Sequence, residues 1–245
     1  MVKIFAVSDI HGYYNELIEA LSNAGFEPNN PDHLLVCCGD YFDRGEQPKE
    51  VMDFLMGIGN KVLIRGNHEQ LLEELCDRHY PHTYDIHNGT FRTIALLSES
   101  FVYDYAYEYT RPFFAQMANY FETENYIFVH SWIPVTVLDS FPKHYIKNRE
   151  FCFNPNWREA HQSDWENAMW GNPFDMADKE LFPDKKIVFG HWHCSAGWAR
   201  SKGISEFEED ACFDIYEEDK FVSIDGCTAH TGKVNVFVLE DNLIS

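Results

Sequence analysis

The sequence predicts an α/β protein built around a parallel sheet. Three observations lead to this class: short apolar runs recur along the N-terminal half, a polar cluster follows each run, and segments with helical periodicity separate them. Repeated strand–loop–helix units favour parallel strands joined by right-handed crossovers. Because the carboxyl ends of parallel strands share one edge of a sheet, we expect the polar clusters to meet there.

The expected elements follow in chain order. Strands are expected at 3–8, 34–38, 61–64, 126–129 and 186–189, and helices at 14–24, 48–56 and 67–75. Gly25 should close the first helix, and Pro48 should open the second. Thr110 should cap a further helix with Pro112 in its first turn. The alternating segments 221–225 and 234–239 should form a closing antiparallel pair.

The bulk composition is that of an ordinary globular protein. With 245 residues, 45% hydrophobic and 24% charged, the chain can bury a substantial core. We find no linker, repeat or low-complexity tract, and we therefore expect one domain over 1–245. An aromatic-rich, cap-like insertion is expected at about 79–125, with its irregular part at 79–109, and a second irregular segment at 140–184.

Charge and cysteine usage limit the partners and the compartment. A net charge of −21 opposes binding to nucleic acid or to an anionic membrane and attracts divalent cations. The seven cysteines include no CxxC pair, which is typical of reduced thiols. The N-terminal apolar run is too short for a signal peptide, and no stretch approaches a membrane span. We therefore expect a cytoplasmic protein, with its oligomeric state open.

The polar clusters contain the residue types of a metal site. The central one, Val36-Cys-Cys-Gly-Asp-Tyr-Phe-Asp-Arg-Gly45, brings Asp40, Asp43 and Arg44 into one loop. Collecting the other strand ends gives a candidate set of carboxylates, imidazoles and an amide: Asp9, His11, Asp40, Asn67, His68, His130, His191 and His193. Such ligands suit Mn, Fe, Zn or Ni. Alone, each of these residues is most simply a turn residue, and their ordered recurrence at strand ends is what predicts a site.

These motifs resemble the ordered signature of calcineurin-like metallophosphoesterases. The resemblance rests on Asp9-x-His11-Gly, Gly39-Asp-x-x-Asp-Arg-Gly45, Gly66-Asn-His-Glu69, Val129-His130 and Gly190-His191, and the Asp-Arg-Gly and Asn-His-Glu versions are similar to PPP-type serine/threonine phosphatases. It implies a four-layer fold, with two mixed sheets packed as a sandwich and flanked by helices. It also implies two divalent metal ions, with Mn as the first choice.

The resemblance further implies a role for each site residue. Asp9, His11 and Asp40 would bind one ion, and Asp40, as the bridge, would bind the other together with Asn67, His130 and His191. His68 would act as general acid oriented by Asp43, and Arg44 would clamp the phosphate. His193, which departs from the PPP pattern, would be an extra ligand of the first ion. The second phosphate-binding arginine of PPP enzymes has no clear counterpart: Arg149 and Arg158 fall in the right interval, but neither lies in a matching context, and the role stays unassigned.

A second motif competes with the metal site. Residues 194–200 have the Cys-x5-Arg form of cysteine-dependent phosphatases, in which Cys194 would attack phosphorus and Arg200 would hold the phosphate. Gly203 makes the following segment a poor helix, and no upstream loop supplies a general acid. The five metal motifs therefore outweigh this one.

The sequence-based hypothesis is a phosphomonoester hydrolase that uses a metal-bound hydroxide and resembles serine/threonine protein phosphatases. Its substrate would be a phosphorylated protein or a small phosphoester or nucleotide. A symmetrical dinucleoside tetraphosphate hydrolase is the close alternative. A catalytically silent metal-binding module is a third, against which the intact set of His68, Asp43 and Arg44 argues.

Overall fold

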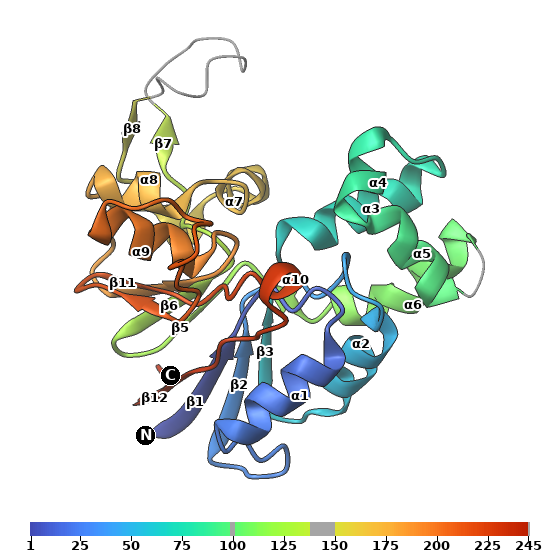
Figure 1. Cartoon of the computed structure of the whole chain (residues 1–245), viewed down its shortest axis with the longest axis horizontal. Coiled ribbons are helices and arrows are strands. Elements are labelled where there is room, and N and C mark those ends of the chain that lie inside the picture. The colour runs from blue at the N-terminus through green and yellow to red at the C-terminus, as the bar shows by residue number, and fades with distance from the viewer. Residues whose placement is uncertain (99–100, 138–149, 245) are drawn as a thin grey trace.

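The computed structural model describes residues 1–98, 101–137 and 150–244, in which two mixed sheets pack face to face between helical layers (Figure 1). The first sheet has the order β12 (Phe237–Asp241), β1 (Val2–Val7), β2 (His33–Cys37), β3 (Lys61–Ile64) and β4 (Met117–Ala118). The second has the order β10 (Tyr216–Glu217), β11 (Phe221–Ser223), β9 (Lys186–Phe189), β6 (Tyr126–Val129) and β5 (Tyr120–Glu122). The short strands β7 (Thr136–Val137) and β8 (Phe151–Cys152) form a separate hairpin.

Helices cover the outer face of each sheet. The first sheet carries α1 (Tyr14–Asn23) and α2 (Pro48–Gly57), and α3 (Asn67–Arg78), α4 (Thr83–Asn88), α5 (Thr90–Ser98) and α6 (Tyr103–Phe114) form a group of helices beside them. The second carries the short 3₁₀ turn Trp157–Glu159, α7 (Gln162–Ala168), α8 (Pro173–Asp178) and α9 (Cys194–Lys202), and α10 (Thr228–Thr231) lies between the two halves. The four-layer α/β fold implied by the sequence is confirmed.

Alternation along the strands produces this layering. In β1, Ile4 and Ala6 belong to the core between the sheets, whereas Phe5 and Val7 pack against the helices. A strand that is apolar on both faces must be buried on both, as a parallel strand between two layers is. Each large side chain so buried stabilises the fold by about 1.5–3 kcal/mol.

Three of the predicted strands, 61–64, 126–129 and 186–189, have the expected bounds, but one predicted strand pairing is wrong. β11 lies parallel to β9 in the second sheet, while β12 runs antiparallel to β1 in the first. The two segments therefore close different sheets. Local alternation cannot distinguish a hairpin from two strands that diverge after a turn.

The predicted start of the last helix in the insertion is also wrong. α6 begins at Tyr103, and Pro112 lies inside its final turn. Thr110 does not cap a helix: its hydroxyl donates to the Ala106 carbonyl at 2.9 Å. Pro112 is tolerated because the carbonyl that its missing N–H would have bonded belongs to Glu108, which is exposed to water.

The segment 79–125 has two parts. Its first part folds into α4, α5 and α6, and its second part supplies β4 and β5, one to each sheet. The assignment of the whole chain to one domain stays a prediction. Within the described residues, no helix combines the length and apolarity needed to cross a membrane, and all seven cysteines are free thiols.

Candidate metal centre

The candidate site lies where the carboxyl ends of strands from both sheets meet. The structure brings together, from the loops after β1, β2, β3, β6 and β9, the side chains of Asp9, His11, Asp40, Asn67, His68, His130 and His191. All but His191 are at most 3% exposed. The expectation that the polar clusters converge is thereby confirmed, while their roles as ligands stay a proposal.

Asp40 lies at the centre of this cluster. Its Oδ2 is 3.8 Å from Nε2 of His11 and 3.8 Å from Nε2 of His68. Its Oδ1 is 3.4 Å from Nε2 of His130. Two groups with the spacing of metal ligands therefore share this carboxylate: His11, Asp40 and His68 form one, and Asp40, His130 and His191 form the other.

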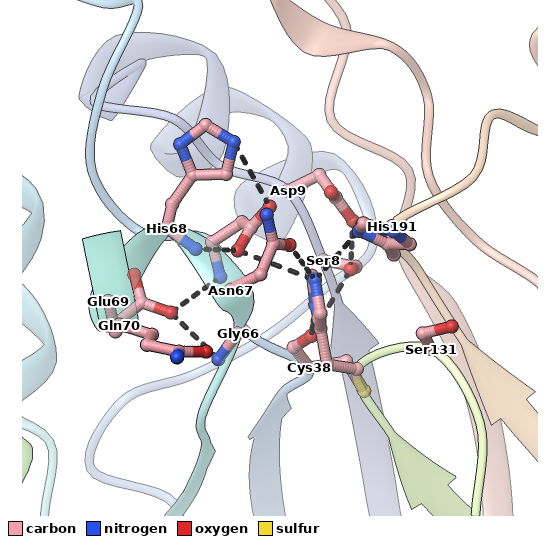
Figure 2. Close-up of polar contacts among 12 residues, drawn as sticks. Ser8, Asp9, Cys38, Gly66, Asn67, His68, Glu69, Gln70, Ser131 and His191 are labelled. Carbon is pink, nitrogen blue, oxygen red and sulfur yellow. Dashed lines mark hydrogen bonds and ion pairs between the residues drawn. The ribbon is translucent and has the colours of Figure 1, made fainter. Parts of the chain in front are cut away.

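The donor atoms around His130 fit a divalent cation. Nδ1 of His130 lies 2.8 Å from the Cys38 carbonyl, which accepts its proton and leaves the lone pair on Nε2. That lone pair faces Oδ1 of Asn67 at 2.8 Å and Nδ1 of His191 at 3.2 Å. Atoms that bind one ion at about 2.1 Å lie about 3–3.5 Å from one another. Figure 2 shows the Asn67 amide directed toward this point.

The charges of the site also fit a cation. Burial and the charge of Asp40 raise the pKa of Asp9. Burial, together with the charge of Arg44, lowers the pKa of His11, and burial together with the charge of His130 lowers the pKa of His191 to about 3. Neutral imidazoles beside crowded carboxylates are the form in which these side chains coordinate metals.

Strained backbone produces this convergence. Within the described residues, non-glycine positions with left-handed φ concentrate in the site loops and include Asp9, His11, Asp40, Asp43, Arg44 and His191. Such conformations cost about 1–3 kcal/mol each and cluster at functional sites. The loops after β1 and β2 support one another, because His11 N–H donates to the Asp40 carbonyl at 2.9 Å and Gly45 N–H donates to the His11 carbonyl at 2.8 Å.

Two glycines give the carboxylates their room. A Cβ on Gly66 would lie 2.2 Å from Oδ1 of Asp40, and one on Gly190 would lie 2.2 Å from Oδ2 of Asp9. Asp40 and Asp9 also accept backbone N–H groups, from His68 at 3.0 Å and from His191 at 2.8 Å. Gly66, two residues before His68, and Gly190, directly before His191, are therefore packing requirements of the site.

Glu69 is a site residue to which sequence reasoning gave no role. Its buried carboxylate accepts three backbone N–H groups: from Asp40 at 3.0 Å, from Tyr41 at 2.9 Å and from Gly66 at 2.8 Å. Figure 2 shows the contact with Gly66. Glu69 thus joins the loops after β2 and β3. Burial and the charge of Asp40 raise the pKa of Glu69 to about 7. The available signal was its place in the first turn of a predicted helix, two residues after Asn67.

His68 and Asp43 form a hydrogen-bonded pair beside the cluster. Nδ1 of His68 lies 2.6 Å from Oδ2 of Asp43. Burial opposes protonation of His68, but the charge of Asp40 and the hydrogen bond and charge of Asp43 outweigh it and raise the pKa of His68 to about 9. Arg44 is exposed, and its two terminal nitrogens lie 2.7 Å from Nε2 of His11 and 3.3 Å from Nε2 of His68.

His193 lies apart from the two ligand groups. Its Nδ1 is 2.9 Å from Oε1 of Glu206, and its ring contacts Phe207 with centroids 5.7 Å apart. It occupies the N-cap position of α9 without a side-chain capping hydrogen bond, one residue beyond Trp192. Only its Nε2 is left free of the contact with Glu206, and the expectation that His193 is an extra ligand stays a proposal.

Arg158 does not reach the site. It pairs with Glu122 at 2.6 Å and with Asp184 at 3.3 Å, and its guanidinium lies over the ring of Trp157. The structure therefore excludes it as the second phosphate-binding arginine in this conformation. Arg149 lies outside the described residues.

The Cys-x5-Arg segment does not form a phosphate cradle. Residues 194–200 lie in helix α9, with Cys194 buried at its first turn. The Cys194 thiol donates to the Ser223 carbonyl at 3.0 Å, and burial raises the pKa of Cys194 to about 12. Arg200 pairs with Asp178, the last residue of α8. A thiolate mechanism at Cys194 is therefore not supported.

A buried carboxylate surrounded by imidazoles, at the strand ends of a two-sheet α/β fold, fits a class of metal-dependent proteins that act on phosphate esters. The chain belongs to the calcineurin-like phosphoesterase family, whose model matches residues 2–195. The family expected from the sequence is thereby confirmed, whereas its PPP branch is not.

Curated relatives match a part of the chain. A symmetrical bis(5'-nucleosyl)-tetraphosphatase of Buchnera aphidicola is 35% identical over 69 residues, which are 28% of this chain and 24% of that protein. The asymmetrical bis(5'-nucleosyl)-tetraphosphatase PrpE of Bacillus velezensis is 38% identical over 71 residues, 25% of this chain and 28% of that protein. The chain thus matches about a quarter of the length of each relative.

Solved structures match the whole fold. A crystal structure of a provisionally assigned diadenosine tetraphosphatase superposes with a TM-score of 0.58 at 16% identity, covering 97% of this chain and 89% of that one. At this level of identity the likeness concerns the fold.

Proposed function

We propose that this protein is a divalent-metal-dependent phosphoesterase that hydrolyses dinucleoside tetraphosphates. The observation that carries the metal dependence is the buried Asp40 carboxylate, which faces imidazoles from three different loops at 3.4–3.8 Å. The relatives named for dinucleoside tetraphosphates support the substrate class. The alternative drawn from the sequence is therefore preferred to a serine/threonine protein phosphatase.

The proposed ligands divide between two ions that share Asp40. Asp9 and His11 would bind the first, with His193 at its edge, and Asn67, His130 and His191 would bind the second. The ions, which we expect to be Mn²⁺, would neutralise charge on the reacting phosphate and lower the pKa of attacking water.

The other residues of the site would bind the phosphate and move a proton. Arg44, exposed beside His11 and His68, would bind phosphoryl oxygens with its two parallel nitrogens. His68 would donate the proton on Nε2 to the leaving oxygen, while Asp43 holds Nδ1 and fixes the ring. A raised pKa keeps that proton available near neutral pH.

Two exposed tryptophans support a substrate with flat rings. Trp192 follows His191 directly and is 37% exposed. Trp170 is 46% exposed, and its indole N–H donates to Oε1 of Gln70 at 3.0 Å, which fixes the ring two residues from His68. Aromatic faces bind nucleobases by stacking, worth about 1–3 kcal/mol per base. A dinucleoside offers two such bases, whereas a phosphoserine offers none.

The test is product analysis with metal-stripped protein, before and after addition of Mn²⁺. We expect diadenosine tetraphosphate to be cleaved only with Mn²⁺, and to give two ADP molecules if cleavage is symmetrical or AMP and ATP if it is asymmetrical. Trp192→Ala should raise KM for this substrate but not for p-nitrophenyl phosphate. Turnover of a phosphoserine peptide with no cleavage of the dinucleotide would restore the protein-phosphatase hypothesis. Mn²⁺ binding without any turnover would indicate a silent module.

A further inference from the structure

The Asp43 carboxylate has two partners besides His68. It is fully buried, and the hydroxyls of Thr90 and Thr93 donate to it, at 2.6 Å on Oδ2 and at 2.6 Å on Oδ1. Both threonines belong to helix α5, which lies in the aromatic-rich insertion rather than in the loops of the metal site. They are at most 1% exposed.

The first turn of α5 is built directly against the Asp43–Arg44 backbone. Thr93 Oγ1 also accepts the Asp43 N–H at 3.1 Å. A Cβ on Gly89, the residue before the helix, would lie 2.7 Å from the backbone nitrogen of Arg44. Thr90 and Thr93 are three positions apart and therefore lie on the same face of the helix. Three neighbouring positions of the insertion thus contact one dipeptide of the loop after β2.

We propose that α5 is a positioning element of the catalytic acid, in which Thr90 and Thr93 fix the Asp43 carboxylate so that it orients the His68 ring. This inference rests on the proposed function. It also gives the insertion a task in catalysis. Because Asp43 can rotate about two side-chain torsions, a carboxylate without these hydroxyls would hold the ring less precisely.

The chemical step defines what must be positioned. The oxygen of water forms a bond to phosphorus as the bond from phosphorus to the leaving oxygen breaks. The leaving oxygen takes the proton from Nε2 of His68, and the proton released by the attacking water returns to the imidazole through solvent. Misplacement of a catalytic group by about 1 Å can cost on the order of 10²-fold in rate. The loss of rate should be largest for substrates whose leaving oxygen most needs the proton.

The test compares substrates that differ in this need. Thr90→Val and Thr93→Val remove a hydroxyl at nearly constant volume, and Thr90→Ser and Thr93→Ser keep it. With Mn²⁺ bound, we expect the valine variants to lose about 10–100-fold in kcat on phenyl phosphate but less than about threefold on p-nitrophenyl phosphate, whose leaving phenolate is stable without a proton. The serine variants should restore most of the rate.

Thr110→Val is the matched control. Thr110 is a buried threonine of the same insertion, and its hydroxyl donates only within its own helix, to the carbonyls of Ala106 and Tyr107. We expect wild-type kinetics on both substrates. Thr90→Val is the cleaner variant, since Thr93→Val also leaves the Asp43 N–H without an acceptor. If Thr93→Val fails to fold, Thr90→Val alone decides the outcome.

A readout independent of turnover is the proton NMR signal of the His68 Nδ1–H, assigned by its loss in His68→Asn. The signal should be shifted downfield in the wild type and in the serine variants, and broadened or shifted in Thr90→Val. Equal losses on both phosphates, or an unchanged signal with unchanged rates, would overturn the positioning role alone. A wild-type protein inactive on all phosphoesters with Mn²⁺ would overturn the proposed function and this inference with it.

Discussion

Glu69→Gln should loosen the metal site without replacing a proposed ligand. In the native site, Oε2 accepts the N–H groups of Asp40 and Gly66, and Oε1 accepts that of Tyr41. A glutamine amide offers one oxygen, so its NH₂ group must face at least one of these donors. Each buried donor left without an acceptor costs about 1–3 kcal/mol, and a hydrogen bond to a charged acceptor is stronger than one to an amide.

We therefore expect Glu69→Gln to lower the free energy of unfolding by about 2–4 kcal/mol. For a chain of this size, that corresponds to a fall in Tm of roughly 5–15 °C. Because the loop carrying Asp40 loses its support, Mn²⁺ affinity should fall as well. Urea unfolding and Mn²⁺ titration of the two proteins at pH 8, where the Glu69 carboxyl is ionised, measure both effects.

Glu74→Gln is the matched control on the same helix. The Glu74 side chain is 44% exposed and pairs with Arg78 at 3.6 Å. Such a surface pair contributes at most about 1 kcal/mol. The role of the Glu69 carboxylate would be refuted if Glu69→Gln had the same stability and the same Mn²⁺ affinity as the wild type. Both proteins are compared in the metal-free form for stability.

Four further substitutions test the proposed general acid, the bridging carboxylate, the buried cysteine and a surface ion pair. His68→Asn should keep bound metal and lose about 10²–10⁴-fold in turnover, since a general acid contributes that much, and loss of metal together with activity would contradict the role. Asp40→Asn should empty both ion positions in metal analysis, and a fully loaded variant would exclude the bridge. Cys194→Ser should retain activity within about twofold, and Cys194 should resist iodoacetamide at pH 8, because its raised pKa keeps the thiol neutral. The hydrogen bond to Arg158 holds the pKa of Glu122 below its usual 4.5, against a smaller effect of burial. Glu122→Gln should therefore cost about 1 kcal/mol of stability at pH 7, and the difference in urea unfolding should shrink as pH falls below 4.5; a difference independent of pH would contradict the ion pair.

The sequence located the strands that carry the site because each is a short apolar run that stops at a polar residue. β3 has the predicted bounds, 61–64, and β6 ends immediately before His130 as expected. The ordered motifs also identified the cluster around Asp40, since parallel strands must bring their carboxyl ends together. These features depend on local patterning.

The sequence did not locate contacts between distant segments. Thr90 and Thr93 lie 47 and 50 positions from Asp43, and nothing in their local pattern distinguishes them from ordinary helical threonines. The pairing of β12 with β1 joins the two ends of the chain. Left-handed φ at Asp9 and Asp40 is likewise invisible, because neither residue type requires it. Tertiary packing decides all of these features.

We propose that this protein hydrolyses phosphoesters at a pair of ions bridged by Asp40. The most direct test of this proposal is to titrate metal-stripped protein with Mn²⁺ while bound metal, the EPR spectrum and hydrolysis of p-nitrophenyl phosphate are followed together. We predict two bound ions per chain, an exchange-coupled dinuclear signal, and activity that rises as the second ion binds. Full activity in the metal-free protein, or activity that saturates when one isolated ion is bound, would contradict the two-ion site.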